Sequence, residues 1–403
     1  MIQISHLVRR VAGVTAALVL AACATPPAPH QPPTQSAPPV TPTPATQVPS
    51  TEMAPYQAVD WSALPATSDA DWLAGFNTWQ RGCPRLQKQA RWAALCADAA
   101  QLPKTAGSAR AFLTSRFTPL TLRNADGSDQ GLITGYYEPV YAGSLSRTSR
   151  NTIPVYGPPN DMITVQLDSI YPELKGKRLR GRLDGKALKP YADADEIARL
   201  ARNNRLNAPV LAWLPDPMDL QFLQVQGSGR IKLADGRELR LGYADQNGWP
   251  YRAIGKWLIE QDELKAADVS MQSIRAWARA NPAKVDQLVA SNPSYVFFRT
   301  LPDSNEGPIG SFGVPLTAGY SLAVDTKHVP AGAPMLIDTT RPDGSPLTRI
   351  AAAQDTGGAI RGQVRADFFW GKGDAAGELA GKMKQPGRLW LLWPKGEPLP
   401  DAN

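Results

Sequence analysis

The sequence predicts a mainly β protein with added helices, of the α+β class. Beyond residue 105, short apolar runs alternate with Gly and Pro, a pattern typical of strands joined by turns. Between residues 68 and 95, large apolar side chains recur at helical spacing instead. A chain of 403 residues exceeds what one hydrophobic core usually serves, so we expect about two or three domains.

The N-terminus has the pattern of a secretory signal. Arg9 and Arg10 precede the apolar stretch Val11–Ala22, which is too short to span a bilayer permanently. The small residues before Cys23 resemble a bacterial lipobox, in which the cysteine is lipidated and becomes the new N-terminus. We therefore expect a signal peptide over residues 1–22 and a lipid anchor on Cys23.

A proline-rich tether is expected to follow the anchor, over residues 23–50. Residues 24–50 contain ten prolines and no Asp, Glu, Lys or Arg, a composition that is typically semi-extended. Ala24, rather than Asp, follows the cysteine, which resembles the pattern sorted to the outer membrane. The expected location is the inner leaflet of the outer membrane of a Gram-negative bacterium, with the body facing the periplasm.

The first part of the body is predicted to be helical. Trp72, Phe76 and Trp79 lie at the spacing of one helix face. The stretch Leu86 to Leu95 is expected to continue as a second helix after Cys83-Pro84. We assign these apolar side chains to a core rather than to a site.

Two cysteines, Cys83 and Cys96, remain in the body beyond the tether. An oxidising periplasm would permit them to form a disulfide. Both also fall within helical patterns, which suits buried free thiols equally well. The sequence leaves these two alternatives open.

Strands and further helices follow along the chain. Gly131 to Gly135 and Arg237 to Gly242 have the strand pattern, and Asp235-Gly236 predicts a hairpin turn. Roughly the last hundred residues are predicted to be strand and loop, ending in a strand at Leu389 to Trp393. Helical patterns occur at residues 193–202, 252–260 and 269–289, the last with a break at Asn281-Pro282.

The charge favours an anionic partner but not a nucleic acid. The formal net charge is +7 at pH 7, and about +5 once Arg9 and Arg10 are removed with the signal. Such a balance suits an acidic polymer or an anionic surface. No run of five or more Lys and Arg residues is present, so nucleic-acid binding is not expected.

Elimination directs the search for catalytic groups to carboxylates. Beyond the tether the chain has a single histidine, His328, so Ser-His-Asp or Cys-His catalysis and multi-histidine metal sites lack their residues. No metal and no cofactor are predicted. Three aspartates lie in glycine-rich loops flanked by strands, where a backbone can approach a ligand closely: Asp325, Asp355 and Asp367.

The local sequence around Asp355 has two further interpretations. Asp355 before Thr356 and Gly357 also suits a simple turn, and the sequence alone weighs turn and catalyst equally. Asp-Thr-Gly is also the signature of aspartic peptidases, which need two such carboxylates. Asp325 is followed by Thr and then Lys327 instead of Gly, so a second half-site is missing and this class is disfavoured.

The three aspartates at these spacings resemble the C-terminal three-aspartate module of the membrane-bound lytic murein transglycosylase A family. The resemblance runs in order from about residue 105 to 395. The further matching motifs are Gly135–Pro139, Val225–Gly229, Gly242–Gly248, Asn292–Phe298, Gly310–Leu316, Gly362-Gln363 and Gly371–Gly373.

That resemblance implies a fold of two β-rich domains with a groove for a glycan strand between them. The main domain would be a double-psi β-barrel built from residues 51–141 and 291–403. The second domain would be an insertion over residues 142–290.

The resemblance also implies the reaction and its catalytic residue. Members cleave the β-1,4 bond between N-acetylmuramic acid and N-acetylglucosamine without water, forming a 1,6-anhydro ring. Asp355 matches the single acid, which then acts as the base, and Asp325 and Asp367 match supporting residues. To begin protonated, Asp355 needs a pKa well above about 3.9, through a negative neighbour such as Asp367 or through burial by the aromatic run Phe368–Trp370. The helpers could equally be structural aspartates that cap turns.

For the glycan, we expect aromatic stacking faces and polar groups along the groove. The two tyrosines could instead be half-buried strand residues. The expected substrate-binding residues are Tyr136, Tyr137, Glu138, Gln226, Gly227, Ser228, Gly229, Thr356 and Gly357.

Two other functions compete with the transglycosylase. One is a peptidoglycan-binding lipoprotein without activity, and the other is a muramidase that hydrolyses with water. The expected partner in each case is the glycan strand, and cell-wall synthases are plausible protein partners.

Overall fold

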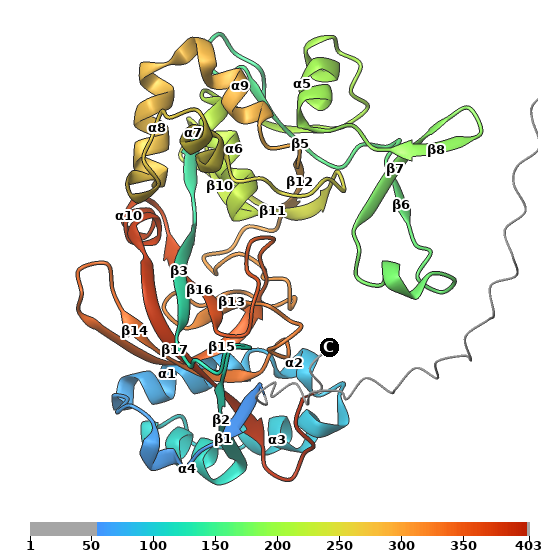
Figure 1. Cartoon of the computed structure of the whole chain (residues 1–403). Helices are drawn as coiled ribbons and strands as arrows, with labels where there is room; N and C mark the ends of the chain where they lie inside the picture. The colour runs from blue at the N-terminus through green and yellow to red at the C-terminus, as the bar shows by residue number, and fades with distance from the viewer. Residues whose placement is uncertain (1–54, 401–403) are drawn as a thin grey trace, which may run out of the picture. The chain divides into compact units, whose positions relative to one another are not determined.

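The computed structural model describes residues 55–400, which contain both helices and strands (Figure 1). The predicted signal peptide, the lipid anchor at Cys23 and the tether lie outside the described residues. Within residues 55–400, no helix has both the length and the apolar character needed to cross a membrane.

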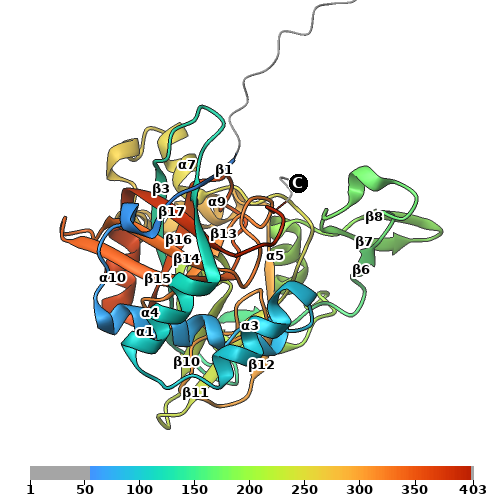
Figure 2. The same cartoon turned by 90° about the horizontal axis from the view of Figure 1, so that it is seen from below.

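The first predicted helix is confirmed as α1, Asp69–Gln80. The Ser68 hydroxyl accepts a hydrogen bond from the Asp71 amide and so caps the N-terminus of the helix. Serine is a common residue at this position. Trp72, Phe76 and Trp79 are buried in the main core together with β-strand residues. Figure 2 shows α1 with α3 (Ala90–Ala100) and α4 (Ala106–Arg116) in front of the strands.

The second predicted helix, over Leu86 to Leu95, is confirmed from Ala90 onward, but its start is wrong because the chain turns between Leu86 and Ala90. The segment forms two helices, α2 (Cys83–Leu86) and α3, and a disulfide joins Cys83 to Cys96. One continuous helix would separate these cysteines by about 20 Å, at about 1.5 Å per residue. The turn brings their Cα atoms to 5.5 Å, within the reach of a disulfide.

We expect the double substitution Cys83→Ala/Cys96→Ala to lower the free energy of unfolding by about 3 kcal/mol, because the bridge restricts the unfolded chain. Urea denaturation of both proteins measures this difference. Wild-type protein kept under reducing conditions is the control and should lose a similar amount. An unchanged unfolding midpoint would contradict the prediction.

The largest sheet closes upon itself. Its strand order is β1-β2-β17-β14-β15-β13-β16-β3, and β17 also pairs with β3. The strands from β17 to β3 therefore form a closed circuit of hydrogen-bonded neighbours, in which β13–β15 and β16–β3 are parallel. The strands are β1 (Tyr56–Ala58), β2 (Phe117–Leu122), β3 (Gly131–Glu138), β13 (Ser321–Val324), β14 (Pro334–Thr340), β15 (Pro346–Asp355), β16 (Arg365–Lys372) and β17 (Lys384–Pro394).

A second sheet, of order β12-β11-β10-β4, belongs to the segment between β3 and β13. The predicted hairpin at Asp235-Gly236 is confirmed between β10 and β11, and β12 joins this sheet from beyond residue 290. Its strands are β4 (Val140–Ala142), β10 (Ser228–Lys232), β11 (Glu238–Gln246) and β12 (Val296–Leu301). Smaller sheets pair β5 (Ile153–Tyr156) with β9 (Val210–Leu214), and β6 (Ile163–Val165) with β7 (Leu179–Asp184) and β8 (Ala187–Pro190).

Helices pack around this second sheet (Figure 1). The predicted helices are confirmed, including the break at Asn281-Pro282. They are α5 (Ala194–Arg202), α7 (Ile254–Glu260), α8 (Met271–Ala280) and α9 (Val285–Ala290).

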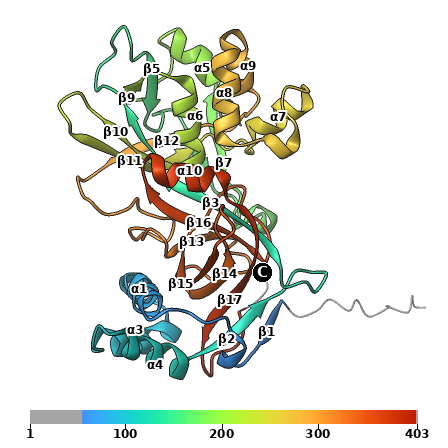
Figure 3. The same cartoon turned by 90° about the vertical axis from the view of Figure 1, so that its left-hand side faces the viewer.

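The sequence patterns did not predict three of the helices in residues 55–400: α4, α6 (Pro217–Gln226) and α10 (Asp374–Lys382). The expectation that the last part of the chain holds only strands and loops is therefore wrong at α10. This helix is rich in Ala and Gly because it packs closely: a Cβ on Gly377 would lie 2.8 Å from the Tyr137 ring. Figure 3 shows α10 between the closed circuit of strands and the helices around the second sheet.

Candidate active site

A pocket of about 160 Å³ opens where β3, β13, β15 and β16 meet the end of α6. It brings together six of the predicted site residues from distant parts of the sequence. The residues that line it are Gly135, Tyr136, Val225, Gln226, Ala323, Asp355, Thr356, Gly357 and Asp367.

Asp355 is the last residue of β15, so its carboxyl group lies where the buried strand leaves the sheet. Its Oδ1 accepts hydrogen bonds from the backbone amides of Ser311, at 2.8 Å, and Thr356, at 2.9 Å. Burial raises the pKa of Asp355 above its ordinary value, and the two amides oppose that rise. The same carboxyl is thus disposed to hold a proton and provided with donors for its anion.

The residue before the acid, Gln354, is fully buried, yet its polar side chain is satisfied. Its Oε1 accepts from the Ser321 hydroxyl at 2.7 Å, and its Nε2 donates to the Thr78 carbonyl at 2.8 Å. The side chain of Gln354 is thus buried without an unpaired polar group. These bonds also tie the end of β15 to α1 and β13.

Asp367 is the second carboxyl group of the pocket. In the parallel pairing of β16 with β3 it lies opposite Thr134, whose hydroxyl donates to its Oδ1 at 2.7 Å. Burial raises the pKa of Asp367 to about 6, and repulsion from Asp355 adds to this rise. The hydrogen bond from Thr134 and the charge of Arg365 oppose it. Asp355 thus raises the pKa of Asp367, whereas burial, and not the expected charge of Asp367, raises the pKa of Asp355.

Tyr136 places a phenol beside both carboxyl groups. Its hydroxyl is buried and lies close enough to Asp355 to lower the pKa of that carboxyl. Burial raises the pKa of Tyr136 well above its ordinary value, and the negative charges of Asp355 and Asp367 add to the rise. The hydroxyl is therefore a neutral donor that is available to a ligand in the pocket. Its ring packs against Phe369, 5.2 Å away between centroids.

Comparison with known proteins gives a second line of evidence, independent of the geometry of the site. The chain is 34% identical to membrane-bound lytic murein transglycosylase A of Escherichia coli (strain K12) over 279 residues, which cover 67% of this chain and 68% of that protein. The chain belongs to the membrane-bound lytic murein transglycosylase A (MltA) family. The MltA specific insert domain matches residues 132–299, and the 3D domain matches residues 320–393.

Solved structures of the MltA family share the fold. MltA from Neisseria gonorrhoeae is 37% identical, with a TM-score of 0.74, over 85% of this chain and 93% of that chain. E. coli MltA with bound chitohexaose is 29% identical, with a TM-score of 0.64, over 85% of this chain and 95% of that chain. The mixed helix and strand fold and the predicted family are thereby confirmed.

Not all residues expected from the MltA resemblance reach the pocket. Asp325 instead accepts from the Gly362 amide at 3.0 Å and the Lys327 amide at 3.3 Å, and so shapes the loops beside the pocket. The Tyr137 ring packs against α10, because neighbouring residues of β3 point to opposite sides. Glu138 is buried in an ion pair with Arg230.

The glycine-rich motif after α6 also serves the fold more than the pocket. Gly227 ends α6 with a positive φ of 73°, and its amide bonds to the helix. Ser228 and Gly229 pair with β11 in the second sheet. From this motif, Val225 and Gln226 line the pocket, and the Gln226 Oε1 accepts a hydrogen bond from the Tyr137 amide at 3.1 Å.

Among the three aromatic residues expected to bury the acid, only Phe369 packs beside the pocket with Tyr136. Phe368 and Trp370 contribute to the main core on the opposite side of β16. Ser311 and Thr134 were not assigned roles from the sequence. The motif Gly310–Leu316 was noted there, and its glycines were the available signal.

We expect Asp367→Asn to stabilise the fold at neutral pH. Between pH 3.8 and about 6 the folded protein retains the Asp367 proton, whereas the unfolded chain has released it. The free energy of unfolding therefore falls as pH rises through this window. Asn does not ionise, so the gain should be about 1–3 kcal/mol near neutral pH and should vanish in acid. Urea denaturation at both pH values measures it, and a gain independent of pH would contradict the explanation.

Proposed function

We propose that this protein is a lytic transglycosylase that cleaves the β-1,4 bond between N-acetylmuramic acid and N-acetylglucosamine in peptidoglycan. The observation that carries the proposal is the Asp355 carboxyl, whose burial raises its pKa while two amides can stabilise its anion. Family membership and the chitohexaose bound to E. coli MltA support a glycan as the substrate.

In this reaction Asp355 acts twice. The protonated carboxyl first gives its proton to the glycosidic oxygen as the bond from that oxygen to C1 of the muramic sugar breaks. The resulting carboxylate, held by the Ser311 and Thr356 amides, then takes the proton of the C6 hydroxyl as that oxygen bonds to C1. No water is consumed, the product ends in a 1,6-anhydro ring, and Asp355 regains its proton.

Other pocket residues have supporting roles in this proposal. The hydroxyl of Tyr136 and the backbone at Thr356 and Gly357 provide polar contacts for the sugars. Asp367 supports Asp355 as the second buried carboxyl of the pocket, and Asp325 orients the adjoining loop.

A hydrolytic muramidase is the second candidate, because Asp367 supplies another carboxyl in the same pocket and hydrolysis commonly uses two. Mass spectrometry of muropeptides released from purified sacculi by the full-length protein separates the possibilities. Products lighter than hydrolysis products by one water support the transglycosylase. Hydrated products would assign a muramidase, and no product from folded protein would favour the binding lipoprotein.

The remaining predictions complete the proposal. Residues 1–22 are a signal peptide, and lipid on Cys23 anchors the protein to the outer membrane with its body in the periplasm. The closed circuit of strands supports a double-psi β-barrel, expected from residues 51–141 and 291–403 around an insertion at 142–290, although β4 and β12 pair within the second sheet. Peptidoglycan is the principal partner, and cell-wall synthases are candidate protein partners.

A further inference from the structure

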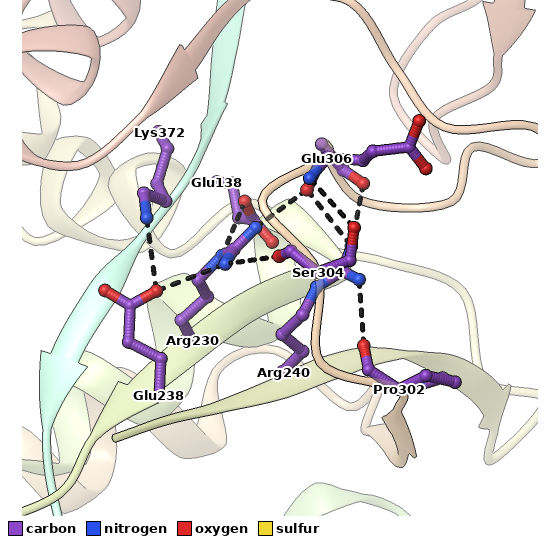
Figure 4. Close-up of polar contacts among 9 residues, drawn as sticks. Glu138, Arg230, Glu238, Arg240, Pro302, Ser304, Glu306 and Lys372 are labelled. Carbon is purple, nitrogen blue, oxygen red and sulfur yellow. Dashed lines mark hydrogen bonds and ion pairs between the residues drawn. The ribbon is translucent and has the colours of Figure 1, made fainter. Parts of the chain in front are cut away.

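Two buried arginines of the second sheet contact the connection that leads to the acid. Arg230 on β10 and Arg240 on β11 lie opposite each other in the antiparallel pairing. They are only 2% and 4% exposed, so their contacts are made inside the protein. Figure 4 shows both guanidinium groups directed toward the segment 302–307, which continues from β12.

The arginines bind this segment through its backbone carbonyls. Arg230 donates to the Ser304 carbonyl at 3.0 Å and the Glu306 carbonyl at 2.7 Å. Arg240 donates to Pro302 at 2.9 Å, Glu306 at 3.1 Å and Gly307 at 2.9 Å. Hydrogen bonds from charged donors are strong and directional, so they hold a segment that has no strand or helix of its own.

The two arginines differ in what else they contact. Arg230 also pairs with Glu138 at 3.0 Å and with Glu238 at 3.1 Å, and Lys372 shares Glu238 (Figure 4). Arg240 donates its hydrogen bonds to backbone carbonyl groups and forms no ion pair among residues 55–400. Replacing Arg240 therefore leaves no carboxylate buried without its partner.

From this segment the chain runs directly to the amide that bonds Asp355. A Cβ on Gly307 would lie 2.3 Å from the Leu316 carbonyl, and one on Gly310 would lie 2.4 Å from the Gln354 carbonyl, so both glycines permit a close approach. The next residue, Ser311, donates its amide to Asp355. A displacement of the held segment would therefore be transmitted to this hydrogen bond.

We propose that Arg240, together with Arg230, is a positioning residue for the acid: it fixes segment 302–307 so that the Ser311 amide stays on Asp355. The inference rests on the proposed function for the role of Asp355 as acid and base. The amide stabilises the carboxylate that must accept the C6 proton, so its position affects the second half of the reaction. The alternative is that the hydrogen bond from the Phe312 amide to the Gln354 carbonyl holds Ser311 in place without a contribution from the two arginines.

The test compares Arg240→Gln with Arg237→Gln, an exposed arginine near the turn of the same hairpin. Arg240→Gln should lower kcat about 10- to 100-fold with a smaller change in KM, since a small displacement of catalytic groups has this effect. The alkaline limb of the pH–activity profile of Arg240→Gln should also move to higher pH, because the Asp355 carboxylate loses the Ser311 amide as a donor. Tyr136 and Asp367, the other ionisable groups that line the pocket, remain in both variants.

A titration of Asp355 by ¹³C NMR of its carboxyl carbon gives a readout that needs no activity. In Arg240→Gln the pKa should rise, whereas in Arg237→Gln it should match wild type. A pKa and an alkaline limb equal to wild type would overturn the inference, as would a uniform loss of activity without either shift. If Arg240→Gln does not fold, Arg240→Lys replaces it, with the same two outcomes. An inactive wild type with a raised Asp355 pKa in the variant would refute the proposed function alone.

Discussion

Replacing Asp355 by Asn is expected to reduce the release of anhydro-muropeptides by about a thousandfold or more, because one group supplies both proton transfers. Asn is nearly isosteric, and its Oδ1 can still accept from the Ser311 and Thr356 amides. The fold should therefore survive while the transferable proton is lost. Timed digestion of sacculi with product analysis by mass spectrometry measures the effect.

Asp343→Asn is a matched control, since Asp343 lies exposed in the turn between β14 and β15. It should retain wild-type turnover. If folded Asp355→Asn also does so, Asp355 is not the acid. In the wild type, activity should fall as pH rises through the raised pKa of Asp355, because only the protonated form can start the reaction.

The substitution Arg230→Met is expected to destabilise the folded protein by about 3–5 kcal/mol, the usual cost of leaving one partner of a buried ion pair alone. Glu138 is 1% exposed and would lose its ion pair with Arg230. Burial already raises the pKa of Glu138. Without Arg230 the folded protein should bind a proton there more tightly, so the destabilisation should increase as pH rises above the ordinary pKa of 4.5.

Urea denaturation at acid and neutral pH measures this change. The double variant Arg230→Met/Glu138→Gln is the control, because it removes the stranded charge together with its partner. It should recover a substantial part of the lost stability at neutral pH. Equal stability of Arg230→Met and wild type would contradict the assignment of the pair.

The sequence predicted the elements whose signals are local. Ser68 begins α1 because its hydroxyl caps the helix a few residues away, and Asp235-Gly236 turns a hairpin for equally local reasons. The division between α2 and α3 was missed because the turn depends on a disulfide with Cys96 and on packing. Helix α10 was missed because its small residues fit against Tyr137, which lies far away in the sequence.

The candidate site shows the same limit. The motif around Asp355 identified the family, but the motif alone does not tell which neighbours share its pocket. Period-two alternation along β3 would have separated Tyr136 from Tyr137, since adjacent strand residues face opposite sides. Thr134 and Ser311 could not be assigned from the sequence, because their bonds to Asp367 and Asp355 are made only by the three-dimensional fold.

The ion pair between Glu138 and Arg230 bears on modular engineering of this fold. Its carboxylate comes from β3 of the closed circuit, whereas its guanidinium comes from the second sheet. Excising residues 142–290 and sealing the chain would leave Glu138 without Arg230 and the carbonyls of segment 302–307 without these donors. The two lobes are therefore interdependent. A minimal enzyme or a chimera with a foreign insert must therefore replace the Glu138–Arg230 ion pair and the hydrogen bonds to segment 302–307, in addition to rejoining the chain.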